Sequence, residues 1–423
     1  MNNCISLELV RWIEEKQMSC NKIFGDLAKD FSNKNIGGIH QISEDYIRQN
    51  AKEKLGLSDE EFDLQFVKEG LLSPTLYPKS KYQNRSFHHS LTQCWDNVDN
   101  ITRNYYKNEY KTFPVEVASA YTGLINAITK PNKSKSEFAI IFDETIMTLS
   151  LLLSRIYFQV IPFTKENDGT FSISLSAKNI ESKINAPDNK AIVGFSDLLI
   201  SLIKFGLPCT ADRHYEPSSF RGIEESVIWL NHYFNLFIMA HEYGHIHLNH
   251  FENYGFKEGS YESNLLSQVD EFEADKFAMD IVVRDSIEKG GLFPFVAIVG
   301  ALLFFEYLLS IERCLYFFLF GEDFLDKPDY SIGVSALEVG MLTHPHAYLR
   351  RYKLFDFLKG TDLNEDGFID AIEKFISEAS NMLWNKSLEN FKYCYYQNFE
   401  IHPVWNWLKE QIIVKKEYGS RHH

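Results

Sequence analysis

Long apolar segments with helical periodicity dominate the second half of the chain, and short polar connections separate them. The segments cover residues 227–250, 263–285 and 294–320, and each is long enough for several helical turns. Gly290 and Gly291 separate the last two, because glycine breaks helical segments. This pattern predicts three consecutive helices within a mainly helical protein.

Two short segments have the composition of β-strands instead. Residues 138–142 read Phe-Ala-Ile-Ile-Phe and follow a polar linker, and residues 170–176 lie amid turn-forming residues. The predicted fold class is therefore mainly α with a small β-sheet, that is, α+β.

The length of 423 residues predicts more than one structural part. Residues 1–110 are polar and mostly helical in pattern, and nothing in them points to a function. Residues 111–350 contain the apolar helices, and residues 351–418 form a C-terminal helical region. Residues 419–423 resemble the start of a purification tag, and we assign them no biological role.

Composition and charge limit the possible partners and compartments. The formal net charge is −15 and no long run of Lys or Arg occurs, which argues against a nucleic-acid groove because phosphate binding needs clustered cations. The six cysteines form no CxxC pair, so no disulfide scaffold is expected. Residues 1–17 carry charges where a signal peptide has its apolar region. These features favour the reducing cytoplasm.

One segment, 292–311, resembles a membrane span in composition. Its first part is uncharged, but Glu306 interrupts it, whereas a lipid-crossing helix needs about 20 consecutive apolar residues. A carboxylate inside the bilayer costs a few kcal/mol. We therefore expect a helix buried in a globular core and no membrane contact, with a membrane-embedded protein as the alternative.

The clearest chemical feature is His241-Glu242-Tyr243-Gly244-His245, an HExxH motif within the predicted helix 227–250. Two histidines at positions i and i+4 lie on one helix face, so their imidazole nitrogens can bind one metal ion. Glu242 is adjacent and can reach a water molecule at an open coordination position. By itself, this pentapeptide is only moderately specific.

A second motif, Glu271-Phe272-Glu273-Ala274-Asp275, strengthens the metal hypothesis. A catalytic zinc ion takes three protein ligands and leaves one position open, and Glu271 can be the third ligand. Asp275 lies one turn further and can accept a hydrogen bond from the second ring nitrogen of a ligand histidine. Ala274 and Gly244 are small and would let the two helices pack closely. The alternative is a pair of amphipathic helices with an exposed acidic face.

Together these motifs resemble the gluzincin metallopeptidases, in particular the HExGH and ExxAD pattern of the CAAX prenyl protease and heat-shock metalloprotease family. A third segment, Thr343 to Arg350, resembles the downstream HPxxxxR segment of that family. The resemblance implies active-site roles for His344 and Arg350, which would stabilise a developing oxyanion. It also implies a strand beside the metal, with its edge open to substrate, and residues 138–142 are the candidate. An ordinary core strand is the alternative.

The family has several membrane spans and this chain has at most one, which favours a relative outside the membrane. The further histidine at 250 and the helical surroundings also resemble the phage-exclusion Lit peptidases and the ImmA/IrrE-type intracellular proteases. The metzincin pattern is excluded, since it needs Gly at 248 and His at 251, where Leu248 and Phe251 stand. We expect His247 and His250 to be solvated or to lie behind the metal ligands.

An unrelated feature is the segment 362–373, which matches the twelve-residue calcium loop of an EF-hand. Its candidate ligands for calcium are Asp362, Asn364, Asp366, Phe368 through its carbonyl, Asp370 and Glu373. Gly367 stands at the sharp turn, and helical sequence flanks the loop. The alternative is a polar turn between two helices without an ion.

The sequence thus predicts a zinc-dependent endopeptidase of a protein or peptide substrate. Zinc would be held by His241, His245 and Glu271, and Glu242 would be the general base. Calcium regulation, phage defence or cleavage of a host protein are extensions of this hypothesis. A membrane-associated CAAX-type protease and a non-catalytic zinc-binding interaction module are the alternatives. The substrate and the oligomeric state do not follow from the sequence.

Overall fold

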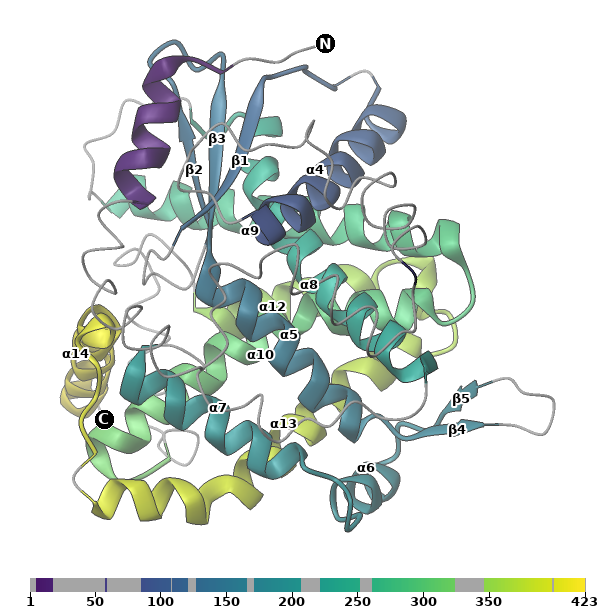
Figure 1. Cartoon of the computed structure of the whole chain (residues 1–423), viewed down its shortest axis with the longest axis vertical. Helices are drawn as coiled ribbons and strands as arrows, with labels where there is room; N and C mark the ends of the chain where they lie inside the picture. Colours follow the sequence, from purple (N-terminus) through teal and green to yellow (C-terminus); the bar gives the residue numbers. More distant parts are fainter. Residues whose placement is uncertain are drawn as a thin grey trace. The chain divides into compact units, whose positions relative to one another are not determined.

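The computed structural model describes residues 5–17, 58, 85–107, 109–120, 127–165, 171–206, 221–251, 261–323, 346–397 and 399–422. These residues are mainly helical, with one three-stranded and one two-stranded sheet (Figure 1). The predicted fold class, mainly α with a small β-sheet, is confirmed.

The chain divides into two compact units. The first comprises Met1–Asn97 and Lys111–Met147, and the second comprises Val98–Tyr110 and Thr148–His423. This division differs from the predicted boundaries near residues 110 and 350. The first boundary moves because the helix over residues 7–17 packs against the sheet and shares its core. No boundary falls near residue 350, because the helix that contains it packs within the second unit.

The sheet of the first unit contains β1 (Val115–Ala120), β2 (Ala127–Pro131) and β3 (Phe138–Asp143). The strand order is β1-β3-β2, with β1 parallel and β2 antiparallel to β3 (Figure 1). All six residues of β3 are buried, as its continuous apolar run requires. The expected edge strand is therefore wrong. Strands that the sequence did not reveal pair with both sides of β3, so it is the central strand.

The second strand prediction, 170–176, is confirmed in shortened form. Within the described residues, β5 (Phe171–Ile173) pairs antiparallel with β4 (Phe163–Lys165). These two strands belong to the second unit.

Helices make up most of the rest of the described chain. Their bounds are α4 (Arg85–Tyr105), α5 (Glu144–Val160), α6 (Ala177–Ile184), α7 (Ala191–Phe205), α8 (Arg221–His247), α9 (Tyr261–Lys289), α10 (Phe293–Phe320), α12 (Ala347–Lys359), α13 (Phe368–Tyr396) and α14 (Asn406–His422). The three predicted apolar helices correspond to α8, α9 and α10. In the second unit, α8 packs against both α9 and α10, and α12 packs against α9 and α10.

Among the described residues, α10 alone is long and apolar enough to cross a membrane. Of its most apolar 18-residue window, 78% is buried inside the protein. Its carboxylates also have partners there, since Glu306 pairs with Arg351 and Glu312 lies 2.6 Å from His346. These contacts support the expectation of a core helix.

Gly300 lets α10 approach α8 closely. A Cβ atom at this position would lie 2.6 Å from the carbonyl oxygen of Leu230 and 3.0 Å from the Cβ of Tyr233. The first contact is with backbone, so the helix itself would have to move. Because α8 also bears the HExxH motif, this contact helps to set the position of the candidate site.

We expect Gly300→Ala to destabilise the protein by about 1–3 kcal/mol, because the added methyl group overpacks the α8–α10 contact. Gly194→Ala in α7 is the matched control, since its Cβ would meet Ile156 at an ordinary 3.5 Å. Alanine favours the helix by up to about 1 kcal/mol over glycine, so the control should be neutral or stabilising. Urea unfolding measures both. Equal stability of the two variants would contradict this view of the contact.

Candidate metal centre

The candidate site forms where α8 and α9 approach each other at two small residues. A Cβ on Gly244 would lie 3.2 Å from the Cα of Ala274 and 3.3 Å from Phe277. Ala274 is fully buried. The predicted packing role of these two residues is confirmed. It brings the HExxH face of α8 against the Glu271 face of α9.

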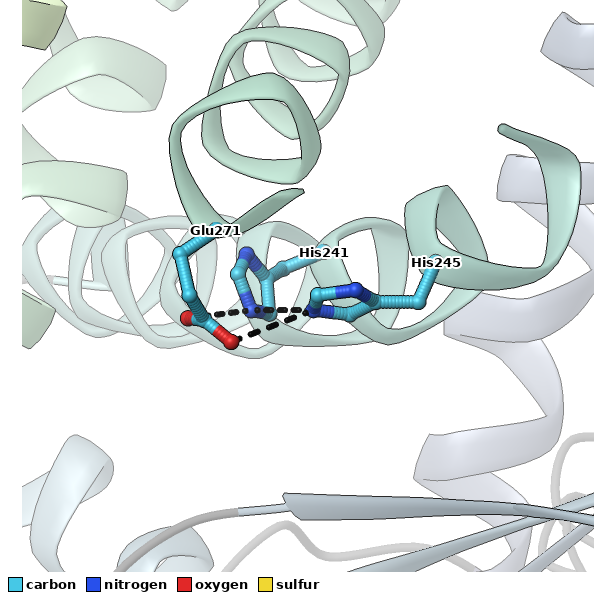
Figure 2. Close-up of side chains that lie close together, drawn as sticks. All are labelled: His241, His245 and Glu271. Carbon is cyan, nitrogen blue, oxygen red and sulfur yellow. Dashed lines mark hydrogen bonds and ion pairs between the residues drawn. The ribbon is translucent and has the colours of Figure 1, made fainter. Parts of the chain in front are cut away.

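Three predicted ligands point toward one another at this contact, two from α8 and one from α9 (Figure 2). The Nε2 atoms of His241 and His245 are 3.2 Å apart. His241 Nε2 lies 3.4 Å from Oε2 of Glu271, and His245 Nε2 lies 3.5 Å from Oε1. The three side chains are 7–13% exposed.

These distances fit a tetrahedral metal site. Zinc binds nitrogen and oxygen at about 2.0–2.2 Å, so two ligands of a tetrahedron lie about 3.3–3.6 Å apart. The donor set of two imidazoles and one carboxylate is that of a catalytic zinc site. The local charge also fits a bound cation, because in the described part of the chain three buried carboxylates, those of Glu242, Glu271 and Asp275, surround one buried guanidinium, that of Arg350. The structure thus brings together three side chains with little exposure, two histidines and one glutamate, that could hold a metal ion.

Asp275 supports His241 from behind. Its Oδ1 lies 2.9 Å from His241 Nδ1, and its side chain is 1% exposed. A bond at Nδ1 leaves Nε2 free to face a metal ion, which is the role predicted for this carboxylate. Burial would raise the pKa of Asp275, but Arg350 and His241 outweigh burial and lower it.

Arg350, at the start of α12, holds this arrangement from a third helix. Its Nε and Nη2 donate to the two oxygens of Asp275 at 2.8 and 2.7 Å, and its Nη1 lies 3.3 Å from Oε2 of Glu271. The guanidinium also lies 5.4 Å from the ring centroid of Phe305. These contacts position the carboxylates. The oxyanion role expected of Arg350 stays a prediction, and His344 lies outside the described residues.

The two ligand histidines differ in protonation. Burial would lower the pKa of His241, but hydrogen bonds to Asp275 and Glu271 outweigh burial and raise that pKa to about 9. Burial and the neighbouring His241 lower the pKa of His245 to about 3. Without a metal ion, His241 is therefore charged and His245 neutral near pH 7.

The two other histidines of this region have different surroundings. His247 is 8% exposed, and its ring stacks on Phe277 with centroids 5.0 Å apart. The expectation that it is solvated is therefore wrong, because the aromatic side chains around α8 cover it. His250 lies behind a ligand, as expected, with its Nδ1 2.9 Å from the Nδ1 of His245. Together with Asp270 and Glu273, His250 forms a second group of side chains that could hold a metal ion. The sequence did not reveal this group.

The predicted calcium loop, residues 362–373, differs in geometry from an EF-hand loop. The helix α13 begins at Phe368, the seventh loop position, so the carbonyl of Phe368 enters the first helical turn instead of facing an ion. Lys359 places its ammonium 2.9 Å from Asp370 and 2.6 Å from Glu373. Asn364 Oδ1 accepts the backbone amide of Ile369 at 3.0 Å.

All six candidate calcium ligands lie within the described residues, and they do not converge as the zinc candidates do. Lysine already supplies a cation to two of the carboxylates. Calcium binding by this loop stays a prediction.

Comparisons of the chain with protein-family models, with curated proteins and with solved structures return no match. The geometry of the site is therefore the basis for inferring the function.

We expect the purified protein to bind about one zinc ion per chain. Glu271→Ala should lose most of it, because two imidazoles remain where three ligands are needed. Glu242→Gln should retain it, because Glu242 is not among the converging ligands. Elemental analysis after dialysis measures both. Full zinc content in Glu271→Ala would show that the third ligand is assigned wrongly.

Metal binding should also release a proton. Since the pKa of metal-free His241 is raised to about 9, the metal displaces its proton at lower pH. At about pH 6, we expect roughly one proton released per ion, and apparent affinity should rise about tenfold per pH unit toward pH 8. Calorimetry in buffers with different ionisation enthalpies measures the release. An affinity independent of pH over this range would contradict the charged state of His241.

Proposed function

We propose that the protein is a zinc-dependent endopeptidase. The observation that carries the proposal is the convergence of His241, His245 and Glu271 at 3.2–3.5 Å, with Glu242 next to the first ligand. Two histidines and a glutamate form the ligand set of known zinc peptidases. A zinc ion held there would polarise a water molecule and a scissile carbonyl group.

The neighbouring side chains support hydrolysis. Glu242 is 5% exposed and could accept a proton from the attacking water and pass it to the leaving amine. Burial would lower the pKa of Arg350, but the carboxylates of Asp275, Glu271 and Glu242 outweigh burial and raise it. The guanidinium of Arg350 thus lies close enough to Glu242 for their charges to interact.

The proposal also includes the compartment in which the protein acts and the class of its substrate. In the described part of the chain, Cys314 and Cys394 form no disulfide bond, which supports a reducing cytoplasm. The mostly buried α10 supports a protein outside the membrane. The substrate would be a protein or peptide, and its identity is a question for experiment.

Replacing the general base tests the proposal directly. In Glu242→Gln the ligands remain, so cleavage should fall by roughly 10²- to 10⁴-fold with zinc retained. The comparison is made in cells that express either chain, by labelling and sequencing new protein N-termini. Glu288→Gln is the matched control, because this carboxylate is exposed near the far end of α9. Cleavage products that appear equally with Glu242→Gln would exclude this mechanism.

Retained zinc with no cleavage by the parent would instead favour the non-catalytic interaction module. Zinc content of the purified parent, together with cleavage in the cells, therefore separates the two classes of function.

A further inference from the structure

After the end of α8, the chain folds back over the last turn of this helix. Asn249 has a positive φ of 65°, a conformation that Asn adopts more readily than most residues. The amide of His250 donates to the carbonyl of His245 at 2.9 Å, and the amide of Asn249 donates to the carbonyl of Ile246 at 3.2 Å. These two bonds form a Schellman motif, in which the residue after the turn lies over the third-last helical residue.

The motif therefore places His250 directly behind the predicted ligand His245. Their Nδ1 atoms are 2.9 Å apart, and their rings meet at 73° with centroids 5.0 Å apart. The side chain of His250 is only 5% exposed. The backbone turn and the side-chain contact are independent observations of the same arrangement.

The other ring nitrogen of His250 faces carboxylates of α9. Its Nε2 lies 3.4 Å from Oε2 of Glu273 and 3.8 Å from Oδ1 of Asp270. These two residues flank Glu271 in sequence, so the helix that supplies the third ligand also supports His250.

Only one hydrogen can lie between the two Nδ1 atoms, and metal binding decides where it is. If His245 binds a metal through Nε2, its Nδ1 carries the hydrogen and donates it to His250. The Nε2 of His250 then carries a hydrogen and points it at Glu273 and Asp270. The arrangement parallels the support of His241 by Asp275 and Arg350.

We propose that His250 is a positioning residue that fixes the tautomer and ring orientation of His245, with Glu273 and Asp270 orienting His250 in turn. The inference rests on the metal centre of the proposed function, and it holds whatever reaction that centre performs. Ligand histidines in metal sites commonly donate their second N–H to such a partner.

A second metal ion at His250, Asp270 and Glu273 is the competing interpretation, since these three side chains could also bind one. The shared hydrogen argues against two ions at once. Neutral His250 can offer Nε2 to a metal only if its own Nδ1 carries the hydrogen, and His245 then presents a protonated Nε2 to the first site.

Zinc affinity of the full-length protein, measured by competition with a chromophoric chelator, tests the proposal without any activity assay. His250→Phe keeps an aromatic ring but removes the acceptor, and it should bind zinc roughly 10- to 100-fold more weakly. His250→Asn places an amide oxygen near the position of Nδ1 and should restore most of the affinity. Glu288→Gln is the control, because it lies on α9 about 22 Å from Glu273 along the helix. Far-UV circular dichroism of the metal-free proteins confirms that each is folded.

The outcomes separate the alternatives. Parent-like affinity in His250→Phe, or equal losses in His250→Phe and His250→Asn, would overturn the positioning role. A second zinc ion in the parent that disappears in both variants would assign the outer group to a metal instead. A parent that binds no zinc would overturn the metal centre itself. If zinc affinity depends on His250 but the chain cleaves nothing, the proposed peptidase activity is contradicted and the positioning role of His250 stands.

Discussion

The close contact of α8 and α9 at Gly244 and Ala274 is the constraint on which the site depends. A Cβ on Gly244 would lie 3.2 Å from the Cα of Ala274, so any larger residue would push the helices apart. His241 and His245 both lie on α8, so the helix separation determines how far Glu271 of α9 lies from their Nε2 atoms, here 3.4 and 3.5 Å. The contact of α8 with α10 at Gly300 holds the same helix nearer its N-terminus, at Leu230 and Tyr233.

The close approach of the helices also buries the charged side chains of the site, where little water can solvate them. An unpaired buried charge costs several kcal/mol, so each ionised group needs partners. Arg350 provides them for Asp275 and Glu271, and the two carboxylates in turn raise the pKa of His241. The arrangement holds the imidazoles and carboxylates in place before any ion binds. Such preorganisation is what a catalytic metal site requires.

Local spacing along the sequence predicted much of this site, because helix geometry is local. The i, i+4 spacing of His241 and His245 placed them on one face, and Asp275 likewise follows Glu271 by one turn. Arg350 entered only through a family resemblance, and its contacts with Asp275 and Glu271 depend on how α12 packs. His250 could have been found from its spacing, since a Schellman motif with Asn249 as the left-handed residue after the end of α8 turns the next residue back.

Features that depend on non-local pairing were harder to predict. The run 138–142 predicted a strand, but not the strands on both sides of β3. The pattern 362–373 matched calcium ligands by residue type, whereas the early start of α13 and the position of Lys359 depend on packing. Residue types and helical spacing can be derived from sequence, whereas the convergence of side chains from different elements depends on how those elements pack.

Anomalous diffraction at the zinc absorption edge, from crystals of the protein grown with zinc, would locate the metal ion itself. We expect one strong peak about 2.0–2.2 Å from Nε2 of His241, Nε2 of His245 and a carboxylate oxygen of Glu271. A peak at His250, Asp270 and Glu273 instead, or no peak between α8 and α9, would contradict it.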